Sequence, residues 1–514
     1  MTKKNIHPTG KVDRIVTFLG SRKFFIGIMV VFLLEAAWIA LSGRYPMAFD
    51  EDFHLGIIRL YAHHISPFWN SHPAGSEAYG AVTRDPSYLY QYLMSFPYRL
   101  ITAITSSQAA QVLFLRFISI GMFAASLPLY RRLLLKSGAS RALVQLSLGI
   151  FILIPIVPLL AAQINYDNLL MPLTALSLLL SVNFVEELER YKRIDVKLLF
   201  LLAITGLLTS LVKYAFLPIL LVEFVYVAVA ARRAYPSAKK FWLSVGFGLT
   251  LMTRRIRTVL MVLVLLSATL FVQRYGVNIV RYHTPVPDCG AVLTVQQCSA
   301  YPPWNRDYSL AQTKADRGGT DSPLVFSADW FYGMWMRSFF AVDGPNTNFQ
   351  TRGPFILPGI GAIVFASAGA VMAAVSLKRM FKRYDGQILG LFVAVTGVYV
   401  LLLWADEYHS FLRTGQAVAI NGRYLLPVLP LLLTVLALGV HVFLRARDGL
   451  KLAFATAAVV CMLWGGGALT YILRSNNAWY WPNRTVQNAN HAVRQVLGPV
   501  TPGYRSPGEF MGRN

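Results

Sequence analysis

Long apolar runs, separated by short polar segments, make up most of the sequence. Each run has about 20 residues, the length at which an α-helix crosses the hydrocarbon core of a bilayer. The pattern predicts an all-α, polytopic membrane protein with about eleven membrane-spanning helices and no soluble domain of ordinary size. The predicted spans are residues 24–43, 111–130, 142–162, 168–185, 196–212, 215–231, 256–274, 354–376, 388–404, 424–444 and 452–473.

Three further apolar segments are predicted to lie along the membrane surface. Residues 50–64 and 86–104 follow the first span and have the amphipathic pattern of interfacial helices. The second is nearly long enough to span. The next run, 111–130, ends in a basic cluster that belongs inside, so that run must enter from outside, and residues 86–104 cannot have crossed before it. Residues 241–252 are too few to cross and are flanked by basic clusters, so we expect them to be interfacial.

The charge supports this interpretation. The chain has a net charge of +24, yet it is 55% hydrophobic and only 14% charged. Its basic residues lie in short clusters between alternate runs, which is the positive-inside bias of a multi-pass membrane protein. Arginine clusters with interleaved aromatic residues are not evident, so we expect no nucleic-acid partner. The N-terminus is predicted to be inside. The absence of eukaryotic retention signals favours a prokaryotic plasma membrane.

The same rule divides the chain into three parts. Residues 1–23 form a basic cytoplasmic N-terminus, 24–473 a transmembrane domain, and 474–514 an external tail. The two largest external loops are residues 44–110 and 275–353. Because the first run is too long for a secretory signal, we expect it to be an uncleaved anchor.

An acidic cluster, Asp50-Glu51-Asp52, stands just beyond the first run. Adjacent carboxylates repel one another, so at least one should hold its proton more tightly and could act as a general base near neutral pH. A solvated acidic loop that caps the following helix explains the cluster equally well. From these residues alone both interpretations stay open.

More charged residues fall at the same predicted outer face. Asp167, Lys213 and Arg423 each stand at the end of a span or just past it. A carboxylate suits deprotonation of an acceptor, and a Lys and an Arg suit a departing phosphate. The alternatives are that Lys213 and Arg423 snorkel at span ends and that Asp167 caps a helix.

The longest external loop contains two of the three cysteines, Cys289 and Cys298. In an oxidising compartment they could form a short-range disulfide, and otherwise they are two free thiols. The sequence leaves this choice open.

Five motifs, in order over residues 49 to 427, resemble those of GT-C glycosyltransferases, polytopic enzymes that include protein mannosyltransferases and the aminoarabinose transferase. The first, Phe49-Asp50-Glu51-Asp52-Phe53-His54, is similar to the Asp-Glu-x-x-His/Tyr signature that follows their first span. The others are Arg84-Asp85-Pro86-Ser87-Tyr88-Leu89-Tyr90, Gln163-Ile164-Asn165-Tyr166-Asp167-Asn168, Lys213-Tyr214 and Asn421-Gly422-Arg423-Tyr424-Leu425-Leu426-Pro427. The likeness is greatest to an uncharacterised bacterial branch of that superfamily.

The resemblance implies a GT-C-like arrangement of helices and roles for particular residues. Asp50 would be the catalytic base or the group that orients the acceptor, with Glu51 as its neighbour. Lys213, Arg423 and Tyr424 would hold the phosphate of the donor.

The acceptor side would hold a second set of residues, Asp167, His54 and Asp85, as acidic, acceptor or metal candidates. The chain departs from the family here, because Asp85-Pro86-Ser87 stands where Pro-Pro is common. Some members use a divalent cation and others do not. No cofactor is therefore certain, and Mg²⁺ or Mn²⁺ is the candidate.

The implied activity is transfer of a sugar from a polyprenyl-phosphate donor to a lipid, glycan or protein acceptor in the cell envelope, at the outer membrane face. The alternative is a lipid-linked sugar flippase or transporter. Charges within the spans are few, Glu35 being the clearest, which disfavours a transport pathway. A non-catalytic scaffold would explain the spans but not the gathering of acids and bases at one face.

Overall fold

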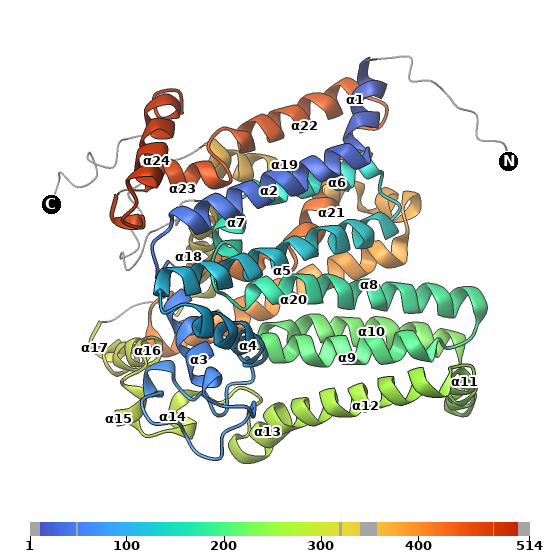
Figure 1. Ribbon diagram of the computed structural model, residues 1–514. Helices are drawn as coiled ribbons and strands as arrows, with labels where there is room; N and C mark the ends of the chain where they lie inside the picture. The colour runs from blue at the N-terminus through green and yellow to red at the C-terminus, as the bar shows by residue number, and fades with distance from the viewer. Residues whose placement is uncertain (1–10, 48–49, 318–320, 340–356, 476, 502–514) are drawn as a thin grey trace.

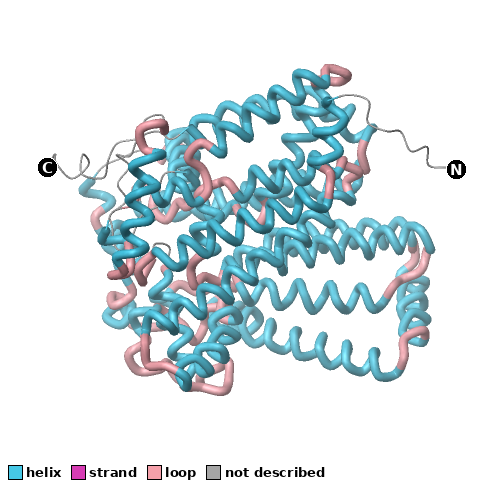
Figure 2. The backbone as a smooth tube through the Cα atoms, turned by 45° about the horizontal axis from the view of Figure 1, so that its top comes forward, coloured by secondary structure: helices cyan, strands magenta, loops and turns pink. Residues whose placement is uncertain are grey.

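The computed structural model describes residues 11–47, 50–317, 321–339, 357–475 and 477–501. Throughout these residues the chain forms helices joined by loops, with no strand (Figure 2). The prediction of an all-α protein is confirmed.

Eight helical stretches are long and apolar enough to cross a membrane. They coincide with eight of the predicted spans, as expected of a polytopic membrane protein. These are α2 (Arg22–Ser42), α5 (Gln108–Lys136), α8 (Asp167–Tyr191), η2 with α10 (Tyr214–Phe216 and Leu217–Ala234), α12 with η3 and α13 (Arg254–Phe271, Val272–Gly276 and Val277–Tyr282), α19 (Leu357–Arg383), α20 (Gly386–Thr414), and α22 with α23 (Asp448–Leu463 and Ala468–Arg474).

The other three predicted spans coincide with shorter apolar helices. One is α6 (Arg141–Ile152), followed by α7 (Ile156–Ala161). The second is α9 (Val196–Val212), and the third is α21 (Leu429–Phe443), preceded by the 3-10 turn η4 (Gly422–Leu425). Every predicted span therefore contains an apolar helix, and the number that crosses stays a prediction.

The bundle has two distinct ends (Figure 1). Two predicted interfacial helices, α3 (Glu51–Ala62) and α4 (Leu89–Ile104), lie at one end with the helices of the long loop. The loop helices are α14 (Cys289–Val292), α15 (Val295–Cys298), α16 (Pro302–Gln312), α17 (Lys314–Arg317) and α18 (Pro323–Phe339). At the opposite end lie α1 (Lys11–Leu19) and the third interfacial helix, α11 (Ala238–Thr250). We call these ends the loop face and the basic face.

The described part of the predicted tail folds back onto the bundle. It contains η5 (Asn477–Trp479) and α24 (Arg484–Leu497), and α24 lies at the loop face beside α23 (Figure 1). Trp38 Nε1, on α2, donates to Asn490 Oδ1 on α24 over 2.8 Å. A structured helix therefore occupies a segment that the sequence marked only as an external tail.

Small polar residues are buried in the centre of the bundle, where α5 packs along α8. Side chains of this size let two helices approach closely. The fully buried ones are Ser119 and Ser126 on α5 and Thr174, Ser177 and Ser181 on α8. One of them, Ser119, meets Tyr90 of α4 with a 3.0 Å hydrogen bond, which connects the bundle to the loop face.

A buried ion pair fixes α3 to the bundle. Arg116 on α5 donates from Nε and Nη2 to the two carboxylate oxygens of Glu51, each over 2.7 Å. Arg116 Nη1 also donates to the carbonyl oxygens of Ala40 and Gly43, at the end of α2. Both charged side chains are fully buried, so every polar contact around them is needed to offset desolvation.

We expect Arg116→Met to lower the free energy of unfolding by about 3–5 kcal/mol, because it leaves the Glu51 carboxylate buried without a cation. Lys136→Met, on the same helix, is the matched control. Its partner is Glu186 and both side chains are about one-third or more exposed, so its loss should cost at most about 1 kcal/mol. Thermal unfolding in detergent measures both, and equal losses would contradict a special role for Arg116.

Candidate active site

Four segments meet at the loop face, each bringing one predicted charged residue. Asp50 precedes α3, Asp167 begins α8, Lys213 follows α9, and Arg423 lies in η4. They form two ion pairs, Asp50 with Arg423 and Asp167 with Lys213. The first pair joins the first external loop to a turn 373 positions further along the chain.

The first pair is Asp50 with Arg423. Arg423 Nη2 donates to Asp50 Oδ2 over 2.5 Å. Its guanidinium is buried, with 5% of the side chain exposed, whereas the Asp50 side chain is 53% exposed. Asp50 has a φ of 70°, a left-handed conformation, and its side chain makes no capping hydrogen bond to the helix it precedes. Burial raises the pKa of Asp50, but Arg423 outweighs this and holds the pKa below its ordinary value. Asp50 is therefore an accessible carboxylate.

The second pair, Asp167 with Lys213, is buried. Lys213 Nζ donates to Asp167 Oδ1 over 2.7 Å, while Asp167 Oδ2 has no hydrogen-bond partner among the described residues. The ammonium lies 4.5 Å from the centre of the Tyr166 ring and 4.9 Å from that of Tyr424. The Tyr424 ring also lies 5.3 Å from Arg423 Cζ. Aromatic faces therefore surround both cations, which compensates part of their lost hydration.

His54 lies one turn into α3, behind the pairs. Its ring meets that of Tyr166 edge-on at 4.5 Å, and Nδ1 donates to Gln91 Oε1 over 3.1 Å. Complete burial lowers the pKa of His54 to about 3, a shift that the nearby Asp50 opposes. The imidazole is therefore neutral at physiological pH and acts as a hydrogen-bonding group rather than a charge.

Local backbone geometry sets the position of Arg423. Asn421 Oδ1 accepts from the Arg423 backbone N–H over 3.1 Å, which begins the η4 turn. Gly422 packs directly on α18, where a Cβ would stand 2.7 Å from the Met334 carbonyl oxygen. Any side chain here would push η4 away from α18, and Arg423 with it.

Glu51 is not brought into the same group, although the sequence placed it beside Asp50 as a catalytic residue. Besides Arg116, its Oε2 accepts from the Met47 N–H (2.8 Å) and its Oε1 from the Ile164 N–H (3.2 Å). Successive residues of a helix start point in different directions, so Asp50 is exposed while Glu51 is buried. The contacts of Glu51 are those of a structural residue.

Asp85 lies near the pairs but is bonded within its own turn. Its Oδ1 accepts from the Ser87 N–H over 2.8 Å, and burial raises its pKa. Ser87 Oγ in turn accepts from the Tyr214 N–H over 3.1 Å. Two of the predicted motifs are thus in direct contact.

These residues do not fit a divalent metal site. Asp50, Asp167 and Glu51 each face an Arg or a Lys, a cation that a divalent metal would have to displace, and Asp85 accepts from the Ser87 N–H. In the part of the chain that the structure describes, no group of three His, Cys, Asp or Glu side chains is arranged to hold a metal ion.

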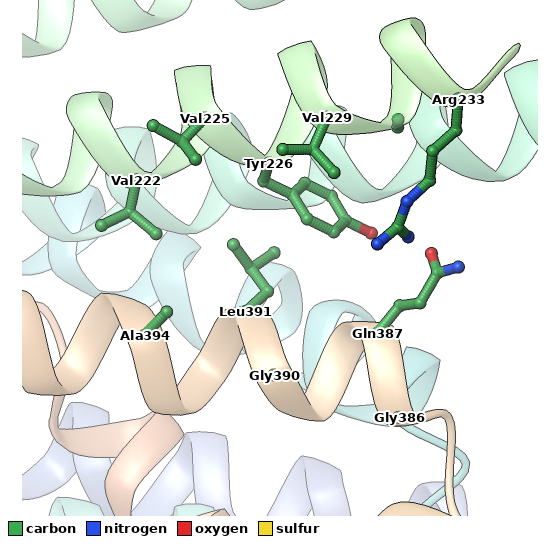
Figure 3. Close-up of a pocket in the computed structure, with 11 residues that line it drawn as sticks. Val222, Val225, Tyr226, Val229, Arg233, Gly386, Gln387, Gly390, Leu391 and Ala394 are labelled. Carbon is green, nitrogen blue, oxygen red and sulfur yellow. The ribbon is translucent and has the colours of Figure 1, made fainter.

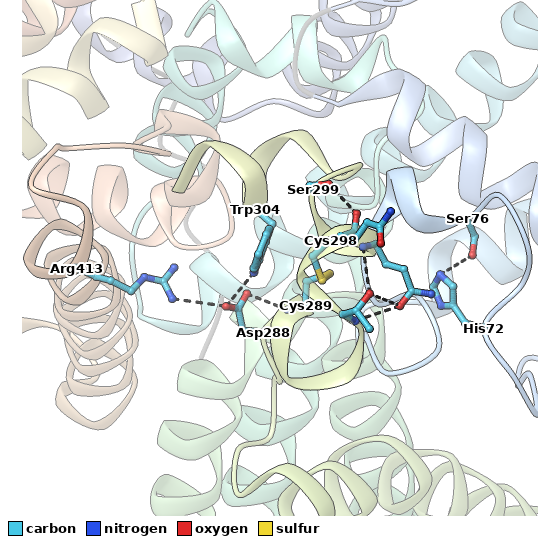
Figure 4. The surroundings of a disulfide bond; sticks show 11 residues. His72, Ser76, Asp288, Cys289, Cys298, Ser299, Trp304 and Arg413 are labelled. Atoms are coloured by element: carbon cyan, nitrogen blue, oxygen red, sulfur yellow. Dashed lines mark hydrogen bonds and ion pairs between the residues drawn. A yellow bond between two sulfur atoms is a disulfide. The ribbon is translucent and has the colours of Figure 1, made fainter. Parts of the chain in front are cut away.

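A disulfide organises the loop that covers α3. Cys289 and Cys298 are bonded, and Asp288 beside them accepts from Trp304 Nε1 over 3.2 Å (Figure 4). Asp288 also lies 3.6 Å from Arg413 of α20, which ties this loop to the bundle. The loop places the ring of Tyr301 5.9 Å from that of Phe53, which is three residues after Asp50 in the sequence.

An apolar groove of about 390 Å³ lies apart from the ion pairs, between α10 and α20 (Figure 3). Val222, Val225 and Leu391 line it, and Arg233 and Gln387 stand at its end near the basic face. The groove therefore does not belong to the candidate active site.

Three residues important to this arrangement were missed in the sequence. Arg116 carried a usable signal, because an arginine inside a predicted span needs a buried partner. Tyr166 was noted only as part of the motif around Asp167, and Tyr301 carried no signal, since aromatic residues are common at membrane interfaces.

No protein-family model and no curated protein sequence matches the chain. Among solved structures, it is similar to a crystal structure of the oligosaccharyltransferase of Archaeoglobus fulgidus, which is tethered to an acceptor peptide. The identity is 12% and the TM-score 0.42, over 88% of this chain and 55% of the archaeal one, so the chain spans about half of that protein. That enzyme belongs to the GT-C superfamily, whose motifs the chain resembles. So distant a likeness carries no argument about chemistry, which depends on the residues of this chain.

The neutral state of His54 makes stability depend on pH. An unfolded His binds a proton below pH about 6.5, whereas the folded protein resists it until its lowered pKa is reached. This contribution to stability is therefore complete above the unfolded pKa of about 6.5 and is lost progressively as the pH falls from there toward the lowered pKa of the folded protein. We expect wild type to lose about 1.4 kcal/mol more than His54→Gln between pH 7.5 and 5.5. Denaturation at both pH values measures this, and His63→Gln, at an exposed position, should behave as wild type.

Proposed function

We propose that the protein is a membrane glycosyltransferase that moves a sugar from a polyprenyl-phosphate donor to an acceptor at the loop face. The observation that carries the proposal is the pairing of Asp50 with Arg423 beside Lys213. An accessible carboxylate next to two buried cations supplies both a base and an anion site. The five motifs that resemble GT-C enzymes support the same conclusion.

The two cations form the donor site in this proposal. Arg423 and Lys213 bind the phosphate, with the Tyr424 ring between them. Asp167 is a positioning residue, since its contact holds Lys213 in place. The long prenyl chain enters from the bilayer, which gives a reason for building the site in a membrane protein.

Donor binding also prepares the base. A phosphate at Arg423 competes with Asp50 for the guanidinium, and the carboxylate then loses the contact that lowers its pKa. Asp50 becomes a stronger base when the donor is bound, so that deprotonation is coupled to the presence of the sugar. Without the donor, the ion pair keeps the carboxylate occupied.

The transfer step follows from these positions. Asp50 takes the proton of an acceptor hydroxyl, and the acceptor oxygen attacks the anomeric carbon. The bond from that carbon to the phosphate oxygen breaks, and its electron pair stays on the lipid phosphate, which Arg423 and Lys213 stabilise. Attack opposite the leaving group inverts the anomeric centre. No step uses a metal, since the two carboxylates of this site, Asp50 and Asp167, each face a cation, so we propose that chelators do not inhibit the reaction.

By the positive-inside rule, the loop face is the outer face of a plasma membrane in this proposal. The acceptor would be a lipid, glycan or protein of the cell envelope. The disulfide between Cys289 and Cys298 supports this orientation, because disulfides persist in oxidising compartments.

A flippase or transporter of lipid-linked sugars is the second candidate. It is favoured by carboxylates inside long apolar helices, namely Glu35 on α2 and Glu223 on α10. Glu35 Oε1 accepts from the Ala468 N–H over 3.3 Å, and Glu223 Oε2 from Ser177 over 2.7 Å. Ionisable groups at such depth often mark a transport pathway.

The test is sugar transfer by the purified protein in vesicles, with radiolabelled polyprenyl-phosphate sugars as donors and native membrane extract as the source of acceptors. We expect Asp50→Asn to lower the rate by about 100-fold or more, since it removes the base. Arg423→Gln should reduce transfer similarly, because the departing phosphate loses its cation. Asp52→Asn, an exposed neighbour on α3, is the matched control and should keep the wild-type rate.

Two outcomes would contradict the proposal. Full activity of Asp50→Asn would remove that residue from the chemistry. Scrambling of labelled lipid between leaflets by folded wild-type protein, without product, would favour the flippase. Sugar transfer that persists in a chelator supports the metal-free step. Loss of transfer in a chelator would overturn the metal-free step but not the proposed transferase activity.

A further inference from the structure

A second concentration of charge lies at the basic face, far from the ion pairs. A pocket of about 380 Å³ opens where the starts of α2 and α6 meet the end of α5. Four of the six residues that line it are arginines. The lining consists of Arg22, Arg131, Arg132 and Arg141, with Phe25 and Pro128.

The four arginines lack acidic partners. In the described part of the chain, no carboxylate lies within 4.0 Å of any of their guanidinium groups, although such pairs form elsewhere. Lys136, one turn further along α5, does have such a partner in Glu186. Four like charges around one pocket repel one another, so the site favours an anion that the chain itself does not supply.

The pocket is built from ordered contacts and is more than a basic surface. The Arg131 guanidinium lies 5.0 Å over the Phe25 ring. Its Nη2 donates to Gln145 Oε1 over 3.2 Å, and Gln145 Nε2 donates to the carbonyl oxygens of Leu19 and Ser21. Gln145 is fully buried. A buried amide thus holds Arg131 and the turn between α1 and α2 in one arrangement.

The surroundings of the pocket indicate a lipid rather than a soluble anion. Phe25 stands on α2, whose neighbouring residues Ile26 and Val30 are exposed and apolar. Phe18, near the end of α1, is also exposed. Apolar side chains on a membrane-spanning helix face acyl chains, so the pocket stands where headgroup phosphates lie.

We propose that this arginine pocket binds the phosphate groups of an anionic phospholipid in the leaflet at the basic face. A guanidinium binds phosphate oxygens with two parallel hydrogen bonds, and basic pockets between membrane helices suit such headgroups. Four guanidinium groups match a headgroup with two phosphates better than one with a single phosphate. The site is independent of the proposed transferase reaction.

The experiment is native mass spectrometry of the full-length protein, titrated with cardiolipin, phosphatidylglycerol or phosphatidylcholine. We expect cardiolipin to bind most tightly and phosphatidylcholine not to bind specifically. Arg22→Gln/Arg141→Gln should weaken cardiolipin binding by about 25-fold, as each basic group near an anionic lipid contributes a factor of about five. Both residues begin helices, where a positive charge opposes the helix dipole, so the variant should fold.

The matched control is Arg190→Gln/Arg193→Gln, which removes two exposed arginines beside Tyr191 at the same face. It should keep cardiolipin affinity within about threefold, given that surface charges act weakly at a distance. Equal losses in both variants would overturn the proposal in favour of a general effect of positive charge. Pyrophosphate, titrated alone, tests a soluble ligand. If pyrophosphate binds as tightly as cardiolipin, and Arg22→Gln/Arg141→Gln abolishes that binding, the lipid assignment is overturned.

Discussion

The contact between Glu51 and Arg116 is the constraint on which the loop face depends. An arginine inside a long apolar helix needs a partner, because a buried charge without one is strongly destabilising. Removing one partner of a buried ion pair costs about 3–5 kcal/mol. Glu51 is that partner, and Arg116 also holds carbonyl groups at the end of α2. The start of α3 is thereby fixed against both α2 and α5. Asp50, one residue earlier, is left exposed on a rigid support.

From this support, contacts extend across the chain. Asp50 meets Arg423, the Tyr424 ring lies beside Arg423 and Lys213, and Lys213 meets Asp167. All four charged residues lie at helix ends or in the turns between helices, and the packing of the helices sets the distances between them. An arrangement of this kind keeps the two cations, Arg423 and Lys213, buried and preorganised, which is the condition under which electrostatic stabilisation of a departing phosphate is strongest.

The two faces of the bundle handle charge in opposite ways. At the loop face, cations near the candidate active site have acidic partners, which a ligand must displace. At the basic face, the arginine pocket has no carboxylate partner within the described residues, so a ligand can bind there without displacing one. A phosphate is suited to both sites, but only at the loop face does its arrival release a group able to react.

The sequence alone determined the helices, since apolar runs of sufficient length leave the backbone no other way to satisfy its hydrogen bonds in lipid. It also singled out Asp50, Asp167, Lys213 and Arg423 as candidates, because all four stand at the outer ends of predicted spans. It could not decide which acid meets which base, or that Glu51 is buried and Asp50 exposed. Those choices depend on helix packing, which brings together side chains such as Glu51 and Arg116 from distant parts of the chain. The choice between a disulfide and two thiols, and the return of α24 to α2, were likewise decided by tertiary contacts, for which hydropathy carries no signal.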